Sequence, residues 1–252
     1  MFEADRIMTS DEIEHTRRLY AAEILAADRA VGDLLDGLDA AGLLDGSVIG
    51  FTSDHGEALG GHHRYWFAHG EFLYDDTLRV PMAFRAPGVV PAETVVAENA
   101  LLQDFAPTLL GLAGLPPLDR QDGVDLSPRL RGETGRAVAE RVSVHFSDHL
   151  LVREQNPRRY LPGREGRWLA LRHGSQKLIR IPTGTGEPND ELYDVSDDPE
   201  ERTDLSQERP GLVAELSTIL AERLRQFRPI VSEAESPEPD LETLESLGYA
   251  GR

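Results

Sequence analysis

The sequence has no cysteine among its 252 residues. This absence excludes disulfides, thiolate metal ligands and a cysteine nucleophile, and it leaves the redox compartment open. No apolar run approaches the roughly 20 residues that cross a bilayer, so we expect no membrane-spanning segment. The first residues are polar and have no apolar stretch. We therefore expect no secretory signal in this sequence, and the localisation stays undetermined.

Basic residues are scarce relative to acidic ones. Lys and Arg number 26 against 45 Asp and Glu, which gives a formal net charge of -19. A surface of this charge repels nucleic acid and anionic lipid, so we expect neither a nucleic-acid nor a membrane partner. An enzyme of this charge that acts on an anionic ester must make its site locally positive, and a bound metal ion is one means of doing so.

The chain opens with a long helical pattern. Thr9 and Glu12 have the spacing of a capping box, and apolar residues then recur at helical spacing, which predicts a helix over residues 9–40 that stops at Gly42. The apolar run at 47–52 predicts a buried strand. A long helix that leads into a buried strand is half of a parallel α/β unit, so this part is expected to be α/β.

The pattern changes near residue 115. Before that point we expect a strand at 80–85, a short strand at 94–96 and a helix at 104–113. After it, the runs alternate as in antiparallel strands, and an amphipathic helix follows. These later elements are expected at residues 142–146, 168–172 and 177–181 for the strands and 212–227 for the helix.

A carboxylate and an imidazole are adjacent at the predicted end of the 47–52 strand. α/β proteins place chemistry where strand ends open into a crevice. Asp54 offers a hard oxygen and His55 a borderline nitrogen, which together suit a divalent cation, and Gly56 lets the backbone turn tightly beyond them. Alone, the tripeptide is a weak signal, because Asp54 could equally cap a turn and His55 lie on the surface.

Further blocks of sequence extend this motif in both directions. They are Gly60-Gly61-His62-His63, His69-Gly70-Glu71, Leu73-Tyr74, Arg79-Val80-Pro81, Ala86-Pro87-Gly88, Asp104-Phe105-Ala106-Pro107-Thr108, Gly123-Val124-Asp125-Leu126, Glu191-Leu192-Tyr193-Asp194 and Asp198-Pro199-Glu200-Glu201. In this order they resemble the sulfatases of the alkaline phosphatase superfamily over nearly the full chain. The resemblance implies an α/β fold: the C-terminal part of an alkaline-phosphatase-like sheet with helices in residues 1–118, then a small α+β domain with an antiparallel sheet in 119–252.

The resemblance also implies roles for individual residues. Asp54 and His55 match one pair of metal ligands for a single divalent cation, commonly calcium and in some relatives manganese. His69 matches the residue that contacts the sulfate and the leaving-group oxygen, and as an imidazolium it could protonate that oxygen. His62 matches a Gly-Glu-His element of the family and His63 follows it, and the resemblance implies that one of them lines the substrate cleft and binds substrate. A loop histidine bonded to backbone remains the alternative for His69, His62 and His63.

Three expected parts of a sulfatase have no counterpart in this sequence. They are the residue that becomes formylglycine, the paired aspartates that complete the metal site and the central histidine. The resemblance therefore implies the C-terminal portion of a sulfuric ester hydrolase, inactive without an N-terminal half that could be encoded separately. Two alternatives stay open: a phosphonate or phosphate monoester hydrolase of the same superfamily, and a non-catalytic fragment that binds a partner.

Overall fold

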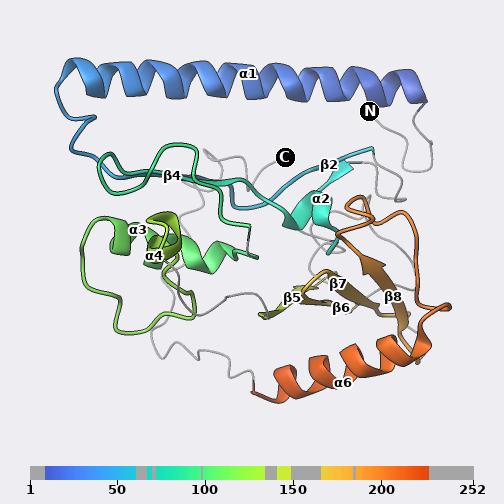
Figure 1. Cartoon of the computed structure of the whole chain (residues 1–252). Coiled ribbons are helices and arrows are strands. Elements are labelled where there is room, and N and C mark those ends of the chain that lie inside the picture. The colour runs from blue at the N-terminus through green and yellow to red at the C-terminus, as the bar shows by residue number, and fades with distance from the viewer. Residues whose placement is uncertain are drawn as a thin grey trace, which may run out of the picture.

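The structure is a computed structural model that describes residues 9–60, 67–69, 72–97, 99–133, 141–148, 166–183 and 186–226. Helix α1 (Ser10–Ala40) runs along one side of the molecule (Figure 1). Its capping box is present as predicted: the Thr9 hydroxyl accepts from the Glu12 N–H at 3.3 Å, and the Glu12 carboxylate accepts from the Thr9 N–H at 2.8 Å. Gly42 follows with a φ of +69°, and it ends the helix as predicted.

The strand expected at 47–52 is β1 (Ile49–Thr52), which pairs with β4 (Met82–Arg85). The pairing is antiparallel, so the expectation of a parallel unit is wrong for the residues that the structure describes. The expectation of burial is also wrong, since the Phe51 side chain is 53% exposed. Within the described residues, β1 pairs with β4 alone, so it has no parallel partner there. In the same residues nothing covers the face that carries Phe51, so its side chain is exposed.

The other face of this small sheet packs on α3 (Phe105–Leu112), which follows the short turn η1 (Leu102–Asp104). The rings of Phe84 and Phe105 stack with centroids 5.3 Å apart, and a Cβ on Gly50 would collide with the Phe105 ring. The helix expected at 104–113 is therefore confirmed. Residues 94–96 form no strand, because Thr94 instead closes a turn by donating to the Pro91 carbonyl at 2.8 Å.

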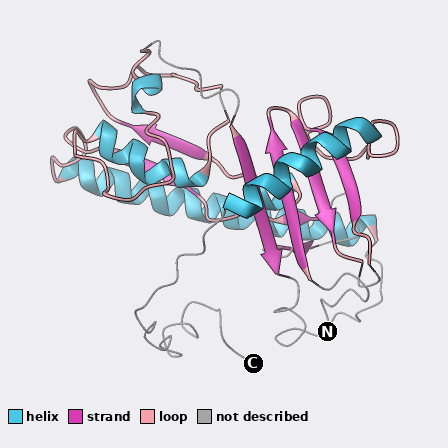
Figure 2. Ribbon diagram, turned by 90° about the horizontal axis from the view of Figure 1, so that it is seen from below, coloured by secondary structure: helices cyan, strands magenta, loops and turns pink. Residues whose placement is uncertain are grey.

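A four-stranded antiparallel sheet forms the second part of the molecule, with strand order β5-β6-β7-β8. Its members are β5 (Val142–Asp148), β6 (Arg167–His173), β7 (Gln176–Ile181) and β8 (Asn189–Asp194). Helix α6 (Pro210–Gln226) crosses one face (Figure 2). Short helix α4 (Ser127–Leu130) lies between the two parts of the sequence. The strands expected at 142–146, 168–172 and 177–181 and the final helix are present.

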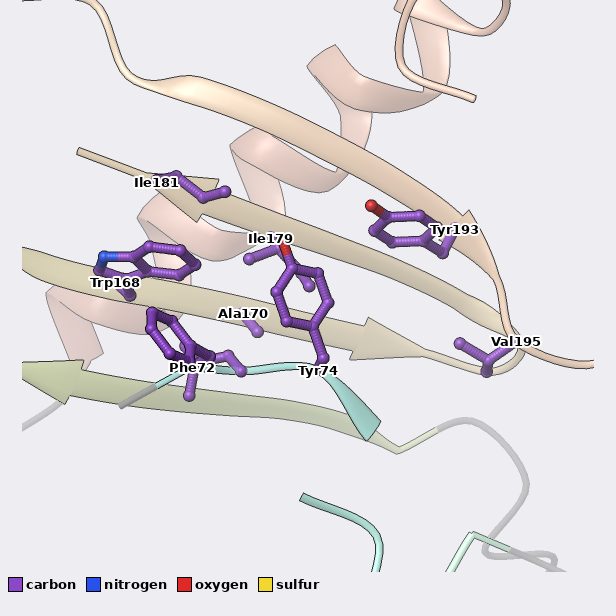
Figure 3. Close-up of a cluster of buried hydrophobic side chains, with 9 residues drawn as sticks. Phe72, Tyr74, Trp168, Ala170, Ile179, Ile181, Tyr193 and Val195 are labelled. Carbon is purple, nitrogen blue, oxygen red and sulfur yellow. The ribbon is translucent and has the colours of Figure 1, made fainter. Parts of the chain in front are cut away.

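Both faces of this sheet are buried. Side chains alternate along β6, so Leu171 joins Leu178 and Leu192 against Leu216 and Leu220 of α6. The opposite face packs against the segment that precedes α2 (Asp75–Leu78), as Figure 3 shows. That second cluster contains Phe72, Leu73, Tyr74, Trp168, Ala170, Ile179, Ile181, Tyr193 and Val195. The sheet thus holds the segment that leads into α2, which in turn contacts the candidate site.

Among the described residues, no helix combines the length and the apolar character that crossing a bilayer requires.

Candidate functional site

The turn after β1 leaves one oxygen of Asp54 available. Its Oδ1 atom accepts the backbone N–H of His55 at 3.0 Å, which fixes the carboxylate. Its Oδ2 atom lies 3.7 Å from Nε2 of His55. The N–H donated by His55, and next the nearby imidazole, lower the pKa of Asp54 below its ordinary value. The carboxylate is therefore ionised at neutral pH, as a metal ligand must be.

The ring of His55 is oriented by the backbone of the next residue. Nδ1 lies 2.9 Å from the carbonyl oxygen of Gly56. A carbonyl can only accept, so in the neutral ring Nδ1 carries the proton and Nε2 keeps its lone pair. This is the tautomer in which a histidine binds a metal through Nε2 while its other nitrogen is held by a carbonyl. Asp54 and His55 therefore direct a free oxygen and a free nitrogen toward each other.

The pairing of two short strands, each of two residues, brings His69 beside His55. β2 (Ala58–Leu59) pairs antiparallel with β3 (Phe67–Ala68), with Ala58 opposite Ala68. One step further, this register sets Glu57 opposite His69. Nδ1 of His69 lies 2.8 Å from a Glu57 carboxylate oxygen, and the ring stacks on His55 with centroids 4.5 Å apart. The Glu57 carboxylate therefore orients the ring of His69.

The turn is also held from outside by α2. The N–H of Gly56 donates to the Thr77 carbonyl at 2.8 Å. A Cβ at position 56 would collide with the Asp76 carbonyl, so this approach requires glycine. Glycine is needed at position 56 because of this close neighbour, and not because of a tight turn with a positive φ.

Asp54 and His55 line a cavity of about 550 Å³. Its other walls come from α2, β4, residues 99–103 and the strands β5 to β7, including His145, Arg172 and Lys177. The described residues lining this cavity do not include His69, which contacts His55 and is 44% exposed. The pair and its cavity thus lie between the two parts of the molecule.

The donor set fits part of a cation site. An oxygen and a nitrogen 3.7 Å apart can share one divalent cation at bond lengths of about 2.0–2.6 Å. In the described part of the chain, no group of three or more His, Asp or Glu side chains could hold a metal. Two protein ligands are too few for tight binding, so a cation at this pair would need further ligands.

His62 and His63, the expected substrate-binding residues, lie outside the described residues. A charged cluster that sequence reasoning missed lies beside the site. The Lys177 ammonium is 2.6 Å from a carboxylate oxygen of Asp75 and 2.6 Å from one of Glu201. Glu201 also accepts the N–H of Asp75 at 2.6 Å. In the sequence, the only indication that Lys177 is buried is the alternation of β7, which places it on the same face as Ile179 and Ile181.

The fold places the chain in a class, the proteins with an alkaline-phosphatase-like sheet. The sulfatase family model matches residues 2–115, and the model of N-sulphoglucosamine sulphohydrolase, C-terminal, matches residues 61–229. The chain belongs to the sulfatase family.

Curated relatives agree with this assignment. The chain is 28% identical to an N-acetylglucosamine-6-O-sulfatase of Bacteroides thetaiotaomicron, over 88% of the chain and 38% of the relative. It is 30% identical to a choline-sulfatase of Rhizobium meliloti, over 82% and 36%. The chain thus spans well under half the length of the curated relatives it matches.

Solved structures share the fold. One, a protein in complex with its substrate D-glucosamine-2-N,6-O-disulfate, has a TM-score of 0.63 and 27% identity over 84% of this chain and 41% of that one. A phosphonate monoester hydrolase from Silicibacter pomeroyi has a TM-score of 0.69 and 24% identity, over 93% and 46%. The fold is therefore the C-terminal portion of an alkaline-phosphatase-like architecture, as predicted.

Proposed function

We propose that the chain is the C-terminal portion of a sulfuric ester hydrolase and that Asp54 and His55 supply two ligands of its divalent cation. One observation carries the proposal: Asp54 Oδ2 and His55 Nε2 lie 3.7 Å apart at the wall of a cavity, with His69 stacked on His55. Membership of the sulfatase family supports a sulfate ester as the substrate. Calcium is the proposed cation, because it is the common one in this family and the Asp54 oxygen suits it. Manganese is the alternative, which the imidazole nitrogen of His55 favours.

A bound cation would polarise the ester oxygens and activate the nucleophile. The residues of this chain orient the groups around it. The Asp54 carboxylate and the neutral His55 ring each present one donor atom. Glu57 fixes the ring of His69 through Nδ1, which leaves Nε2 free to carry a proton to a departing alkoxide or phenoxide. The nucleophile is a part that we expect outside this chain.

The metal pair can be tested without turnover. Mn²⁺ is titrated into the isolated chain while the imidazole NMR signals are followed. The paramagnetic ion should broaden the signals of His55 and His69 before that of His15, which lies exposed on α1. Asp54→Ala should abolish this selectivity, whereas Asp45→Ala, an exposed aspartate near Arg85, should preserve it. Uniform broadening of all histidines, or selectivity that survives Asp54→Ala, would contradict the proposal.

The ester is tested by turnover. The isolated chain with calcium or manganese should hydrolyse a chromogenic aryl sulfate no faster than buffer, because two ligands hold a cation weakly. Robust turnover by the chain alone, lost on Asp54→Ala, would refute this dependence on a missing part. In a protein completed with an N-terminal sulfatase portion, aryl sulfate should be cleaved faster than aryl phosphate or phosphonate. The reverse order would favour the phosphonate or phosphate monoester hydrolase, and no hydrolysis of any ester would favour a non-catalytic fragment.

A further inference from the structure

Three charged side chains meet where α2 contacts the four-stranded sheet. Lys177 of β7 and Glu201 are each 2% exposed. The Nζ atom of Lys177 lies 2.6 Å from Oδ1 of Asp75 and 2.6 Å from Oε1 of Glu201. Lys177 is on the same face of β7 as Ile179, which lies among the buried aromatic side chains of Figure 3. An amine and a carboxylate are thus in contact at a place largely closed to solvent, and the proposed hydrolysis uses neither.

Glu201 is held against both partners. Its Oε2 atom accepts the backbone N–H of Asp75 at 2.6 Å, while Oε1 faces the Lys177 ammonium. The φ of Glu201 is +53°, a conformation that residues other than glycine adopt at an energetic cost and that is concentrated at functional sites. Burial raises the pKa of Glu201 to about 7. Near neutral pH this carboxyl group can therefore take up a proton and release it again.

Arg172 approaches the other oxygen of the Asp75 carboxylate. It is opposite Lys177 in the register of β6 and β7, and its Nη1 atom lies 3.4 Å from Oδ2 of Asp75. The lysine therefore contacts Oδ1 while the guanidinium contacts Oδ2. Negative charge that develops on Oδ2 when a nucleophile attacks the carboxyl carbon would be stabilised by this cation.

We propose that Lys177 and Asp75 condense to an intramolecular amide bond and that Glu201 carries the proton for this reaction. The Lys177 ammonium gives one proton to Glu201, and the resulting amine attacks Cγ of Asp75. Oδ1 then leaves as water, with one proton from the attacking nitrogen and one from Glu201. The ion pair becomes an amide and one water molecule, the Glu201 carboxylate is restored, and no oxidant or co-reactant is needed. The structure shows the ion-paired state that precedes the bond.

The fold favours this condensation because it already holds the reacting groups together, which removes the entropy cost of an encounter. The bond would join the first residue of α2 to β7, across 102 residues of sequence. The Thr77 carbonyl of the same helix accepts the N–H of Gly56. A cross-link at Asp75 would therefore fix the helix that supports the turn after β1. This inference does not depend on which ester the protein hydrolyses.

The bond changes the mass of the chain, so mass spectrometry tests it directly. The purified chain is kept folded at neutral pH, as circular dichroism shows, and is weighed after denaturation. Its mass should be lower than that of the sequence by one water molecule, and trypsin should no longer cleave after Lys177. Fragmentation of the digest should identify one branched peptide that contains Asp75 and Lys177. Asp75→Asn should lose ammonia in place of water, because its amide nitrogen becomes the leaving group.

Three further variants assign the reaction to these side chains. Lys177→Met keeps the length of the side chain without the amine, so it should retain the full mass. Glu201→Gln should slow the mass loss about a hundred-fold, because an amide cannot take up the lysine proton. Glu200→Gln is the matched control, since this neighbouring carboxylate is exposed, and it should lose water at the original rate.

A folded chain with the full mass of its sequence would overturn the proposal and leave the three groups as an ion-paired cluster. Loss of water that persists in Lys177→Met would also overturn it, because an aspartate would then have cyclised onto its own backbone. Equal rates for Glu201→Gln and Glu200→Gln would contradict the role of Glu201 as the proton carrier.

Discussion

The four-stranded sheet and helix α1 contain similar apolar side chains, but only the sheet buries them. Leu171, Leu178 and Leu192 are completely inaccessible beneath α6, whereas Ile24 and Leu34 of α1 are more than half exposed. The sheet and α6 complete their own core from residues within the chain. Helix α1 and the β1–β4 sheet do not, although local signals such as the capping box are satisfied. Secondary structure can therefore be fully specified where tertiary packing is not.

The largest difference in stability between the two regions should come from removing a charged side chain. Lys177→Ala would leave Asp75 and Glu201 buried without their shared cation, and breaking a buried pair in this way costs about 3–5 kcal/mol. Arg18→Ala removes an exposed pair with Glu14 and should change the free energy of unfolding by at most about 1 kcal/mol. Urea unfolding of both variants measures the difference. Equal losses of unfolding free energy in the two variants would mean that ion pairs contribute equally to stability in the two regions.

Apolar truncation gives the next largest effect. Leu178→Ala removes a completely buried side chain and should cost about 2–5 kcal/mol. Ile24→Ala removes an exposed one and should change the stability of the isolated chain by no more than about 0.5 kcal/mol. Thermal unfolding of the two variants is the test. A comparable loss for Ile24→Ala would show that α1 is already packed in the isolated chain.

Between about pH 4.5 and 7, the stability should depend on pH through Glu201, which lies against the sheet. Burial raises the pKa of Glu201 from 4.5 to about 7, since Lys177 only partly offsets it and shares its charge with Asp75. The folded state then binds this proton more tightly than the unfolded state. Its stabilising contribution is complete below about pH 4.5 and is lost as the pH rises through 7. Across this window the free energy of unfolding should fall less steeply with pH for Glu201→Gln and should keep its slope for Glu200→Gln, whose carboxylate is exposed.

The smallest effect should come from the cap of α1. Thr9→Ala removes an acceptor for the Glu12 N–H, and losing such a cap costs about 1 kcal/mol where the helix end is coupled to the fold. Because Arg17 anchors the start of α1 by donating to the carbonyls of Leu59 and Gly60, we expect hydrogen exchange to speed up in its first turns while exchange in the β5–β8 sheet is unchanged. Faster exchange across that sheet as well would contradict the separation of the two regions.

Local patterns predicted most of the elements. The Thr9 and Glu12 spacing located the start of α1, and strand alternation located β5, β6 and β7. The strand expected at 94–96 failed because Thr94 bonds back to Pro91, which a run of apolar residues does not reveal. The burial of β1 failed because burial depends on neighbouring strands, which no local pattern can supply.

Part of the site was predictable for a different reason. Asp54 and His55 are adjacent in the sequence, so their proximity needed only a turn. The Glu57 and His69 contact depends on the register of β2 and β3, each only two residues long and without visible periodicity. Lys177 is farther still from its partner Asp75 in sequence, and only the folded chain brings the two together.

The short helix α2 connects the β5–β8 sheet to the turn that carries Asp54 and His55. At its start, Asp75 is bonded to Glu201 and Lys177, and further along the Thr77 carbonyl accepts the N–H of Gly56. Any lesion that loosens the β5–β8 sheet would release α2 and with it the backbone that orients Asp54 and His55. A variant in that sheet could then weaken the proposed cation site before the protein shows any loss of solubility.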